Sequence, residues 1–322
     1  MNVNQPIRAV IPEELAGTRL DIVLARMFKD YSRTTLKGWI LEGKVLVDSS
    51  RVRPRETVTG GEHIELWAEP DINAWQPQPM EMDIIYEDGD LIVIDKPAAL
   101  VVHPGAGNQD GTLLNALLHH EPSLASLPRA GIVQRLDKDT SGIMVVARSQ
   151  RAHTKLVAQL QSHKLQREYQ AIVSGLLTAG GRVDAPVGRH VTQRTRMAVV
   201  SHGKRALTHY RVIRRFRAHT HIRLRLETGR THQIRVHMAH LRHPLVGDPI
   251  YGGRVRTSPG CNSRLTTLLQ EFKRQALHSS SLTLEHPATG QQLGWTAPIP
   301  HDMRALLDHL ASDLEEVNDP VC

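Results

Sequence analysis

The sequence is short of cysteine and of long apolar runs, and each shortage excludes a class of protein. Among its 322 residues there are two cysteines, Cys261 and the final Cys322. They are too few for a disulfide framework or a cysteine-rich metal site, which makes a reducing compartment the simpler setting. No stretch approaches the roughly 18 apolar residues of a membrane-spanning helix, and the first residues hold no signal-peptide core. We therefore expect a soluble, cytoplasmic protein with no membrane contact.

Acidic residues are missing from one long segment. The whole chain carries 40 Lys and Arg against 33 Asp and Glu, but residues 185–226 hold eleven basic residues and no acid. A surface built from this segment would carry a strong positive potential and attract a polyanion. The alternative is a solvated face whose positive charge is balanced by acidic residues from elsewhere in the fold. Because 42 consecutive residues contain no acid, this is the weaker interpretation.

The length and the spacing of apolar residues predict two domains. A chain of 322 residues exceeds the usual size of one domain. Over residues 17–68, apolar residues at helical spacing predict two short helices, followed by strands at 44–47 and 62–66. Residues 68–81 contain three prolines and little periodicity, which indicates a semi-rigid linker. The predicted layout is a domain over 1–68, a linker over 69–81 and a second domain over 82–322.

The second domain is organised around residues 129–148. Arg135 and Asp137 lie in a polar loop that leads directly into the apolar run 143–147, which is typical of a buried strand. A loop attached to a rigid strand is a suitable place for a catalytic group. On these residues alone, however, an ordinary turn carboxylate explains Asp137 at least as well.

Further elements follow from the same patterns. Residues 83–86 and 91–95 predict a hairpin, and 149–163 predict an amphipathic helix. A strand is expected around Tyr169. Near residue 224, alternation places Ile222 and Leu224 inward and leaves Arg223 and Arg225 on an open face.

Neither a cofactor nor a metal is expected. The glycines at 105, 107 and 111 miss the dinucleotide-binding spacing by one position, which excludes that fingerprint. Histidines recur around the helix predicted near residue 238, yet no Glu or Cys is placed to complete a zinc set with them. Packing roles, or positions that face the expected polyanion, are the favoured interpretation for His232, His237, His240 and His243.

The segment QRLDKDTSG, residues 134–142, resembles the signature loop of the RsuA/RluA family of RNA pseudouridine synthases. The likeness extends nearly end to end and implies an α+β fold with a mixed, largely antiparallel catalytic sheet. Residues 18–48 are similar to the small α-L RNA-binding domain first known from ribosomal protein S-four. The chain departs from the family at Gln134, where His is usual and where Gln carries no charge near neutrality.

The resemblance implies roles for individual residues. Asp137 would be the catalytic carboxylate, Arg235 its partner, and Tyr169 the residue that stacks on the target uracil and takes the C5 proton. Arg135 would occupy the space that the flipped base vacates, and Lys96 would shape the floor of the cleft. The basic residues expected on RNA are Lys29, Arg33, Lys37 and Lys44 in the first domain, and Arg194, Arg196 and Arg230 in the second.

The implied reaction is the isomerisation of uridine to pseudouridine, in which the N1–C1′ bond breaks, the uracil turns, and C5 joins C1′. Asp137 would attack C1′ or remove the C2′ proton, and the sequence does not separate these routes. The implied partner of this monomer is large-subunit 23S ribosomal RNA, at the helix 69 loop, or a pre-ribosomal particle. The alternatives are a sister synthase for another ribosomal or transfer RNA uridine, a catalytically weak ribosome-assembly factor, and a hydrolytic glycosylase.

Overall fold

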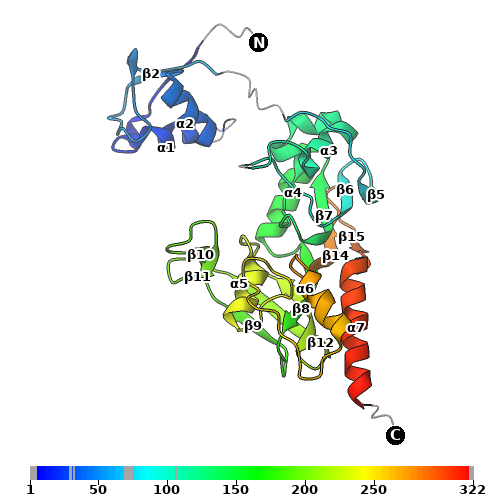
Figure 1. Cartoon of the computed structure of the whole chain (residues 1–322). Helices are drawn as coiled ribbons and strands as arrows, with labels where there is room; N and C mark the ends of the chain where they lie inside the picture. Colours follow the sequence, from blue (N-terminus) through cyan, green and yellow to red (C-terminus); the bar gives the residue numbers. More distant parts are fainter. Residues whose placement is uncertain (1–5, 29–30, 32, 69–74, 106, 319–322) are drawn as a thin grey trace. The chain divides into compact units, whose positions relative to one another are not determined.

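The chain forms two compact units, which divide after residue 74 (Figure 1). The computed structural model describes residues 6–28, 31, 33–68, 75–105 and 107–318. The division falls inside the predicted linker 69–81. Lys29 and the first part of that linker, residues 69–74, lie outside the described residues.

The small unit packs two helices against an antiparallel sheet. Apolar side chains of both helices, such as Leu24 and Leu36, meet Ile64 of the sheet in a common core. The predicted helices and the two predicted strands are confirmed, whereas the first strand and a short third one were not predicted. The helices are α1 (Leu20–Met27) and α2 (Arg33–Glu42), and the sheet order β1-β4-β2-β3 joins β1 (Ile7–Val10), β2 (Val45–Val47), β3 (Ser50–Arg51) and β4 (His63–Leu66).

The large unit is built on a mixed sheet of nine strands, which confirms the α+β class. Eight strands follow the order β5-β6-β7-β14-β8-β13-β12-β9, and β15 pairs with β14 outside this path. Strands β7 and β14 run parallel, while the other neighbours are antiparallel. The bounds are β5 (Asp83–Glu87), β6 (Leu91–Lys96), β7 (Ser141–Ala147), β8 (Gln166–Ser174), β9 (Gly181–Asp184), β12 (Leu207–Arg215), β13 (His219–Leu226), β14 (Leu277–Glu285) and β15 (Gln292–Thr296).

Both faces of the central strands are buried. In β7, Met144 and Val146 belong to one core and Ile143 and Val145 to another, as the alternation of side chains along a strand requires. Helices α3 (Leu113–His120) and α5 (Gln233–His240) cover the first face, and α4 (Gln150–Gln161) covers the second. The helix predicted over 149–163 is thereby confirmed, with Ser149 capping its first turn.

Helices α6 (Ser263–Glu271) and α7 (His301–Asn318) pack together, as the orange and red ribbons of Figure 1 show. Their shared core contains Leu269, Phe272 and Met303. The pattern of residues 296–316 predicts an acidic terminal helix, which α7 confirms. Neither α6 nor the hairpin of β10 (Val187–Arg189) and β11 (Met197–Val199) was predicted. None of the helices in the described part of the chain is long and apolar enough to cross a membrane.

The far end of the predicted linker belongs to the large unit. The Asn115 side chain of α3 donates to the carbonyl of Gln76 at 2.8 Å, and the Asn115 carbonyl accepts from the backbone N–H of Gln78 at 3.0 Å. Residues 76–78 are therefore attached to α3.

Candidate active site

The loop that carries Asp137 is held in place from beneath by Lys96 at the end of β6. This side chain is fully buried, and its ammonium donates to the carbonyls of Pro97 at 2.6 Å, Leu100 at 2.9 Å and Lys138 at 3.0 Å. Burial lowers the pKa of Lys96 to about 8, against the opposing charges of nearby aspartates. Three donors matched to three carbonyls make Lys96 a structural anchor for the loop.

The segment before β14 anchors the same loop from another direction. Arg274 donates to the carbonyl of Asp139 at 3.2 Å, and Gln275 donates to the hydroxyl of Thr140 at 3.0 Å. The N–H of Thr140 in turn bonds the carbonyl of Asp137 at 3.0 Å, closing a tight turn. The backbone of Asp137 is therefore fixed before any ligand binds.

Gly142 lets the loop enter the sheet between two strands. Its φ is +111°, and a Cβ there would lie 2.2 Å from the carbonyl oxygen of Ser279 on β14. Only glycine combines that backbone conformation with so close an approach of the parallel neighbour. The end of the signature loop is thus dictated by the packing of β7 against β14.

Arg235 joins two carboxylates. Its Nη1 donates to Oδ2 of Asp137 at 3.0 Å, while its Nε and Nη2 donate to Oδ2 and Oδ1 of Asp248 at 2.7 and 2.9 Å. Burial opposes the charge of Arg235, but the bonds to Asp248 and the two negative charges outweigh it and raise the pKa of Arg235. The guanidinium is therefore a permanent cation at this point.

The two aspartates differ in how fully their oxygens are used. The Asp248 side chain is inaccessible to solvent and, besides Arg235, also accepts from the backbone N–H groups of Ile250 and Tyr251 at 2.9 Å each. Burial alone would raise the pKa of Asp248, but Arg235 holds it below its usual range. Asp137 is 17% exposed and is bonded by Arg235 through one oxygen. Asp248 thus positions Arg235, and Asp137 keeps acceptor capacity for a ligand.

His232 completes the wall beside Asp137. Its Nε2 lies 3.9 Å from Oδ2 of Asp137, and its Nδ1 lies 2.9 Å from the hydroxyl of Tyr251. That hydroxyl also accepts from the N–H of Met197 at 2.9 Å, so Tyr251 ties His232 to strand β11. Burial lowers the pKa of His232 more than the charge of Asp137 raises it, which favours a neutral imidazole.

A cavity of about 430 Å³ opens in front of these groups. Its size falls in the range of roughly 300–1,000 Å³ that is usual for small-ligand sites. Asp137, Arg235, His232 and the exposed Arg135 all line it, together with His103. The arrangement offers one carboxylate with a fixed cation behind it to a ligand about the size of a nucleoside.

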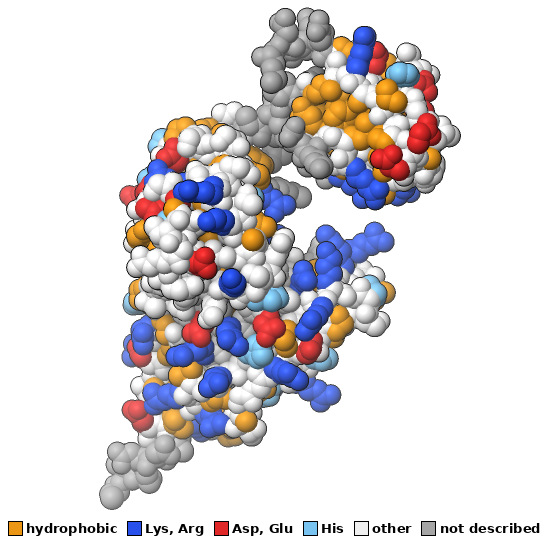
Figure 2. All heavy atoms as spheres, turned by 180° about the vertical axis from the view of Figure 1, so that it is seen from behind, with side chains coloured by type: hydrophobic (Ala, Val, Ile, Leu, Met, Phe, Trp, Pro, Cys, Tyr) orange, Lys and Arg blue, Asp and Glu red, His pale blue; other side chains and the backbone are white. Residues whose placement is uncertain are grey.

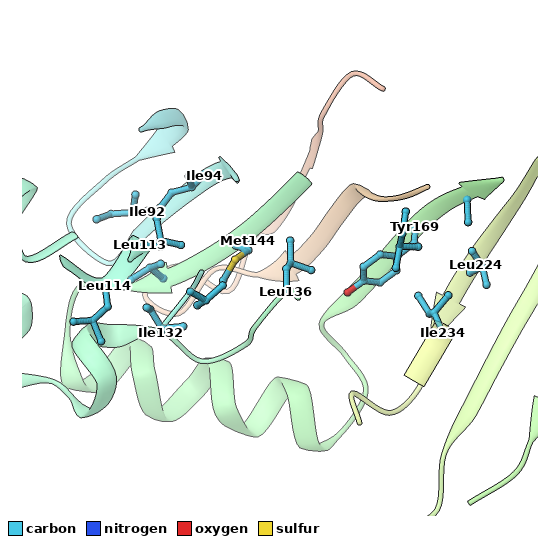
Figure 3. Packing of buried hydrophobic residues seen from close by; sticks show 14 of the residues in the cluster. Ile92, Ile94, Leu113, Leu114, Ile132, Leu136, Met144, Tyr169, Leu224 and Ile234 are labelled. Atoms are coloured by element: carbon cyan, nitrogen blue, oxygen red, sulfur yellow. The ribbon is translucent and has the colours of Figure 1, made fainter. Parts of the chain in front are cut away.

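Tyr169 lies in the core behind the loop. It is 4% exposed and packs in the same cluster as Leu136, Leu224 and Ile234, which Figure 3 shows around its ring. It does not belong to the residues that line the cavity. Burial raises the pKa of Tyr169, and the charge of Asp137 adds to the rise. Its hydroxyl is therefore neutral near pH 7.

Gln134 stands beside the catalytic loop with an unsatisfied amide. Its Nε2 is buried and finds no hydrogen-bond partner among the described residues. The Asp137 contacts described above do not involve this side chain.

The basic residues predicted to contact RNA lie in both units. In the small unit Lys37 is exposed, Arg33 pairs with Asp21 at 2.6 Å, and Lys44 pairs with Glu42 at 2.5 Å. In the large unit, Lys and Arg side chains gather over the half that carries β8 to β13 (Figure 2). The predicted members there are the exposed Arg194 and Arg230, and Arg196, which donates to the carbonyl of Ile250 at the cavity wall.

Sequence reasoning missed the positioning residues Asp248 and Tyr251 and the place of His232 at the cavity. Asp248 precedes a proline, a pattern that indicates a turn and conceals its bond to Arg235. Among the other histidines, His237 is buried between Thr208 and the carbonyl of Ala185. Within the described residues, no group of three or more His, Cys, Asp or Glu side chains is arranged to hold a metal ion.

Both units match family models. Residues 90–240 match the model described as RNA pseudouridylate synthase, and residues 18–64 match the S4 domain. The chain is 56% identical over 308 residues to a Pseudomonas aeruginosa protein, covering 95% of this chain and 96% of that one. It is 54% identical over 317 residues to an Escherichia coli K12 protein, covering 98% and 97%. Both relatives are named ribosomal large subunit pseudouridine synthase D.

Two solved human structures share the fold of the large unit. The structure titled human RNA pseudouridylate synthase domain containing 4 matches with a TM-score of 0.56 at 24% identity, over 71% of this chain and 93% of that one. The structure titled human RNA pseudouridylate synthase domain containing 1 matches with a TM-score of 0.54 at 23% identity, over 77% and 98%.

Proposed function

Because the chain belongs to the RNA pseudouridine synthase family and is therefore an isomerase, we propose that it modifies uridines in the helix 69 loop of large-subunit 23S ribosomal RNA. The names of its close relatives support a ribosomal RNA substrate, and the S4 match of the small unit supports RNA binding by a second domain. The particular loop rests on the resemblance of the sequence to that branch of the family.

The observation that carries the proposal is the Asp137–Arg235 pair at the cavity. A carboxylate with one oxygen on Arg235 and acceptor capacity left over is suited to meet the sugar of a nucleotide. Uracil leaves as a delocalised anion and no water is consumed, so a single carboxylate suffices where glycosidases use two. Asp137 acts as the nucleophile at C1′ or as the base at C2′.

The target base has to leave its stack to reach the cavity, at a cost of a few kcal/mol. Arg135 is exposed at the cavity, so we assign it to the space that the base vacates. A planar guanidinium stacks on neighbouring bases and contacts phosphate, which offsets part of the cost. Tyr169 is assigned to the uracil face and to the C5 proton. This role requires its ring to become accessible when the substrate enters, and its neutral hydroxyl to pass its own proton to solvent as it takes the proton from C5.

RNA binding is assigned to the basic residues of both units. Arg33, Lys37 and Lys44 contact phosphates from the small unit, and Arg194, Arg196 and Arg230 contact them from the large one. The enzyme acts as a monomer on the ribosomal RNA or on a pre-ribosomal particle in the cytoplasm. The isomerisation uses no redox equivalent and transfers no phosphate, so the proposal requires no cofactor.

Mapping pseudouridines in ribosomal RNA tests the proposal. A strain lacking the gene is complemented with the wild-type chain or with Asp137→Asn. We expect the helix 69 uridines to stay unmodified in the deletion strain and with Asp137→Asn, and to be modified with the wild type. Losses at another RNA site would identify a sister synthase, and an unchanged map would support the assembly-factor alternative.

A further inference from the structure

A second hollow, of about 840 Å³, lies over strands β8, β9, β12 and β13 of the large unit. We refer to it as the arginine groove. It shares no lining residue with the cavity at Asp137. The charged residues among its lining are four arginines and one glutamate, namely Arg211, Arg215, Arg223, Arg225 and Glu168.

The arginine groove faces away from the catalytic cavity. In β13, Ile222 and Leu224 pack in the core that also contains Leu136, the neighbour of Asp137. Because successive side chains of a strand point to opposite faces, Arg223 and Arg225 project from the other side of the sheet. Both are exposed, as the alternation in the sequence predicted.

The arginines stand next to one another across the strands. Arg211 of β12 is the register partner of Arg223 of β13, and His209 is the partner of Arg225. Like charges directly opposite each other destabilise a sheet. This pairing therefore has a cost in the isolated chain, and an anion bound between the side chains would relieve it.

Among the described residues, acids offset this charge only in part. Glu168 approaches Arg223 at 4.0 Å with both side chains well exposed, a contact worth little in water. Glu227 is bonded to His209 at 2.7 Å. Arg215 donates to the backbone carbonyls of Leu177 and Thr178, which carry no charge. Over the described residues, the ion pairs of the groove therefore leave a net positive surface.

We propose that the arginine groove binds the phosphodiester backbone of a second segment of the RNA whose uridine occupies the catalytic cavity. Guanidinium groups bind phosphate oxygens in pairs, and several of them along two strands suit a chain of phosphates better than a single anion. The groove is also about twice the volume of the cavity that takes one nucleotide. The inference rests on the proposed function in that the occupant is the same RNA.

With the arginine groove as a second binding surface, the affinity of the enzyme for an RNA depends on the size of that RNA. RNA that reaches both faces of the sheet gains phosphate contacts, whereas a short hairpin fills only the catalytic side. The enzyme should therefore discriminate between a complete ribosomal RNA and its isolated hairpin through binding, with the chemical step unchanged.

The test compares wild type with Arg211→Gln/Arg223→Gln/Arg225→Gln on full-length 23S ribosomal RNA and on the isolated helix 69 hairpin. For the long RNA we expect KM to rise roughly tenfold or more with kcat unchanged, and the salt dependence of log kcat/KM to become shallower by about three. For the hairpin we expect no change in either constant. The matched control, Arg211→Lys/Arg223→Lys/Arg225→Lys, keeps the charge and should keep most of the affinity.

An unchanged KM on the long RNA, or an equal loss on both RNAs, would overturn the proposal. Filter binding of the same two RNAs separates it from the proposed function. If the wild type binds the long RNA more tightly than the triple Gln variant but makes no pseudouridine in it, the groove stands and the assigned reaction fails. If the wild type modifies the RNA and both proteins bind equally, the groove fails alone.

Discussion

Arg235 reaches Asp137 through a 3.0 Å hydrogen bond, although 98 positions separate the two residues in the chain. The bond holds the carboxylate at the cavity while Asp248 holds the guanidinium from behind. This chain of three side chains, rather than any one residue, sets the position of the Asp137 carboxylate.

Replacing Asp137 with Asn should abolish turnover while RNA binding persists. The amide keeps the shape but can neither attack C1′ nor remove the C2′ proton, so we expect kcat to fall by roughly a thousandfold or more. Tritium release from C5-labelled uridine measures turnover, and filter binding measures affinity. Asp139→Asn is the comparison within the loop, and a larger loss there than at 137 would move the catalytic role to Asp139.

Asp248→Ala should destabilise the protein and reduce activity together. It leaves the buried Nε and Nη2 of Arg235 without partners, a change that typically costs about 3–5 kcal/mol. Urea unfolding measures the loss. The matched control is Asp302→Ala, since that carboxylate pairs with Arg274 but is 45% exposed and should contribute at most about 1 kcal/mol. Equal losses in the two variants would show that Asp248 has no special positioning role.

Tyr169→Phe separates the ring from the hydroxyl. The phenyl ring can still stack on uracil but cannot take the C5 proton, so we expect tritium release to slow by roughly a hundredfold or more with RNA affinity unchanged. Tyr169→Leu should in addition weaken binding, because it removes the aromatic plane. A Phe variant as fast as wild type would assign the residue to stacking alone.

Gln134→His should change turnover by less than about threefold. The Asp137 carboxylate takes its hydrogen bond from Arg235, and the Gln134 amide adds no bond to it, so an imidazole at this position is not needed for the pair to form. Single-turnover kinetics on the hairpin measure the effect. A rise of tenfold or more would mean that the natural chain lacks a required group, in favour of the catalytically weak alternative.

Stability should fall as the pH drops below neutrality. Burial lowers the pKa of His219 and of His221 to about 4 from 6.5, so the unfolded chain takes up protons first. Their contribution is complete above pH 6.5 and is lost as the pH falls toward 4. We expect about 2 kcal/mol per histidine between pH 7 and pH 5, by urea unfolding. His221→Gln should flatten the profile, and a flat wild-type profile would contradict the assignment.

Local patterns predicted much of the fold. Three predictions were confirmed: the buried strand at 143–147, the helix at 149–163 and the alternation around Leu224. In each case a few consecutive residues are enough to show which side chains are buried. Strand β1 was missed because four residues are too few to establish a period. Helix α6 was missed although Leu265, Leu268 and Leu269 stand at helical spacing, so its pattern could have been recognised.

Less of the candidate active site than of the fold could be predicted from the sequence. Asp137 and Arg235 were connected through the family resemblance, since spacing alone says nothing of a contact across 98 residues. Asp248 and the Tyr251–His232 bond were missed because their importance lies in orientation, which periodicity does not encode. The burial of the Gln134 amide was likewise not predicted, because the sequence of a loop does not show which of its side chains are buried.

Strand β14 has a bearing on when the enzyme becomes competent during synthesis. Strands β7 and β8 do not pair directly, because β14, from near the end of the chain, is inserted between them. During translation, therefore, β7 and β8 cannot be joined into one sheet until residues 277–285 have been synthesised. A chain that ends before residue 274 also lacks the supports that Arg274 and Gln275 give to the loop of Asp137, so we expect such truncated chains to be inactive.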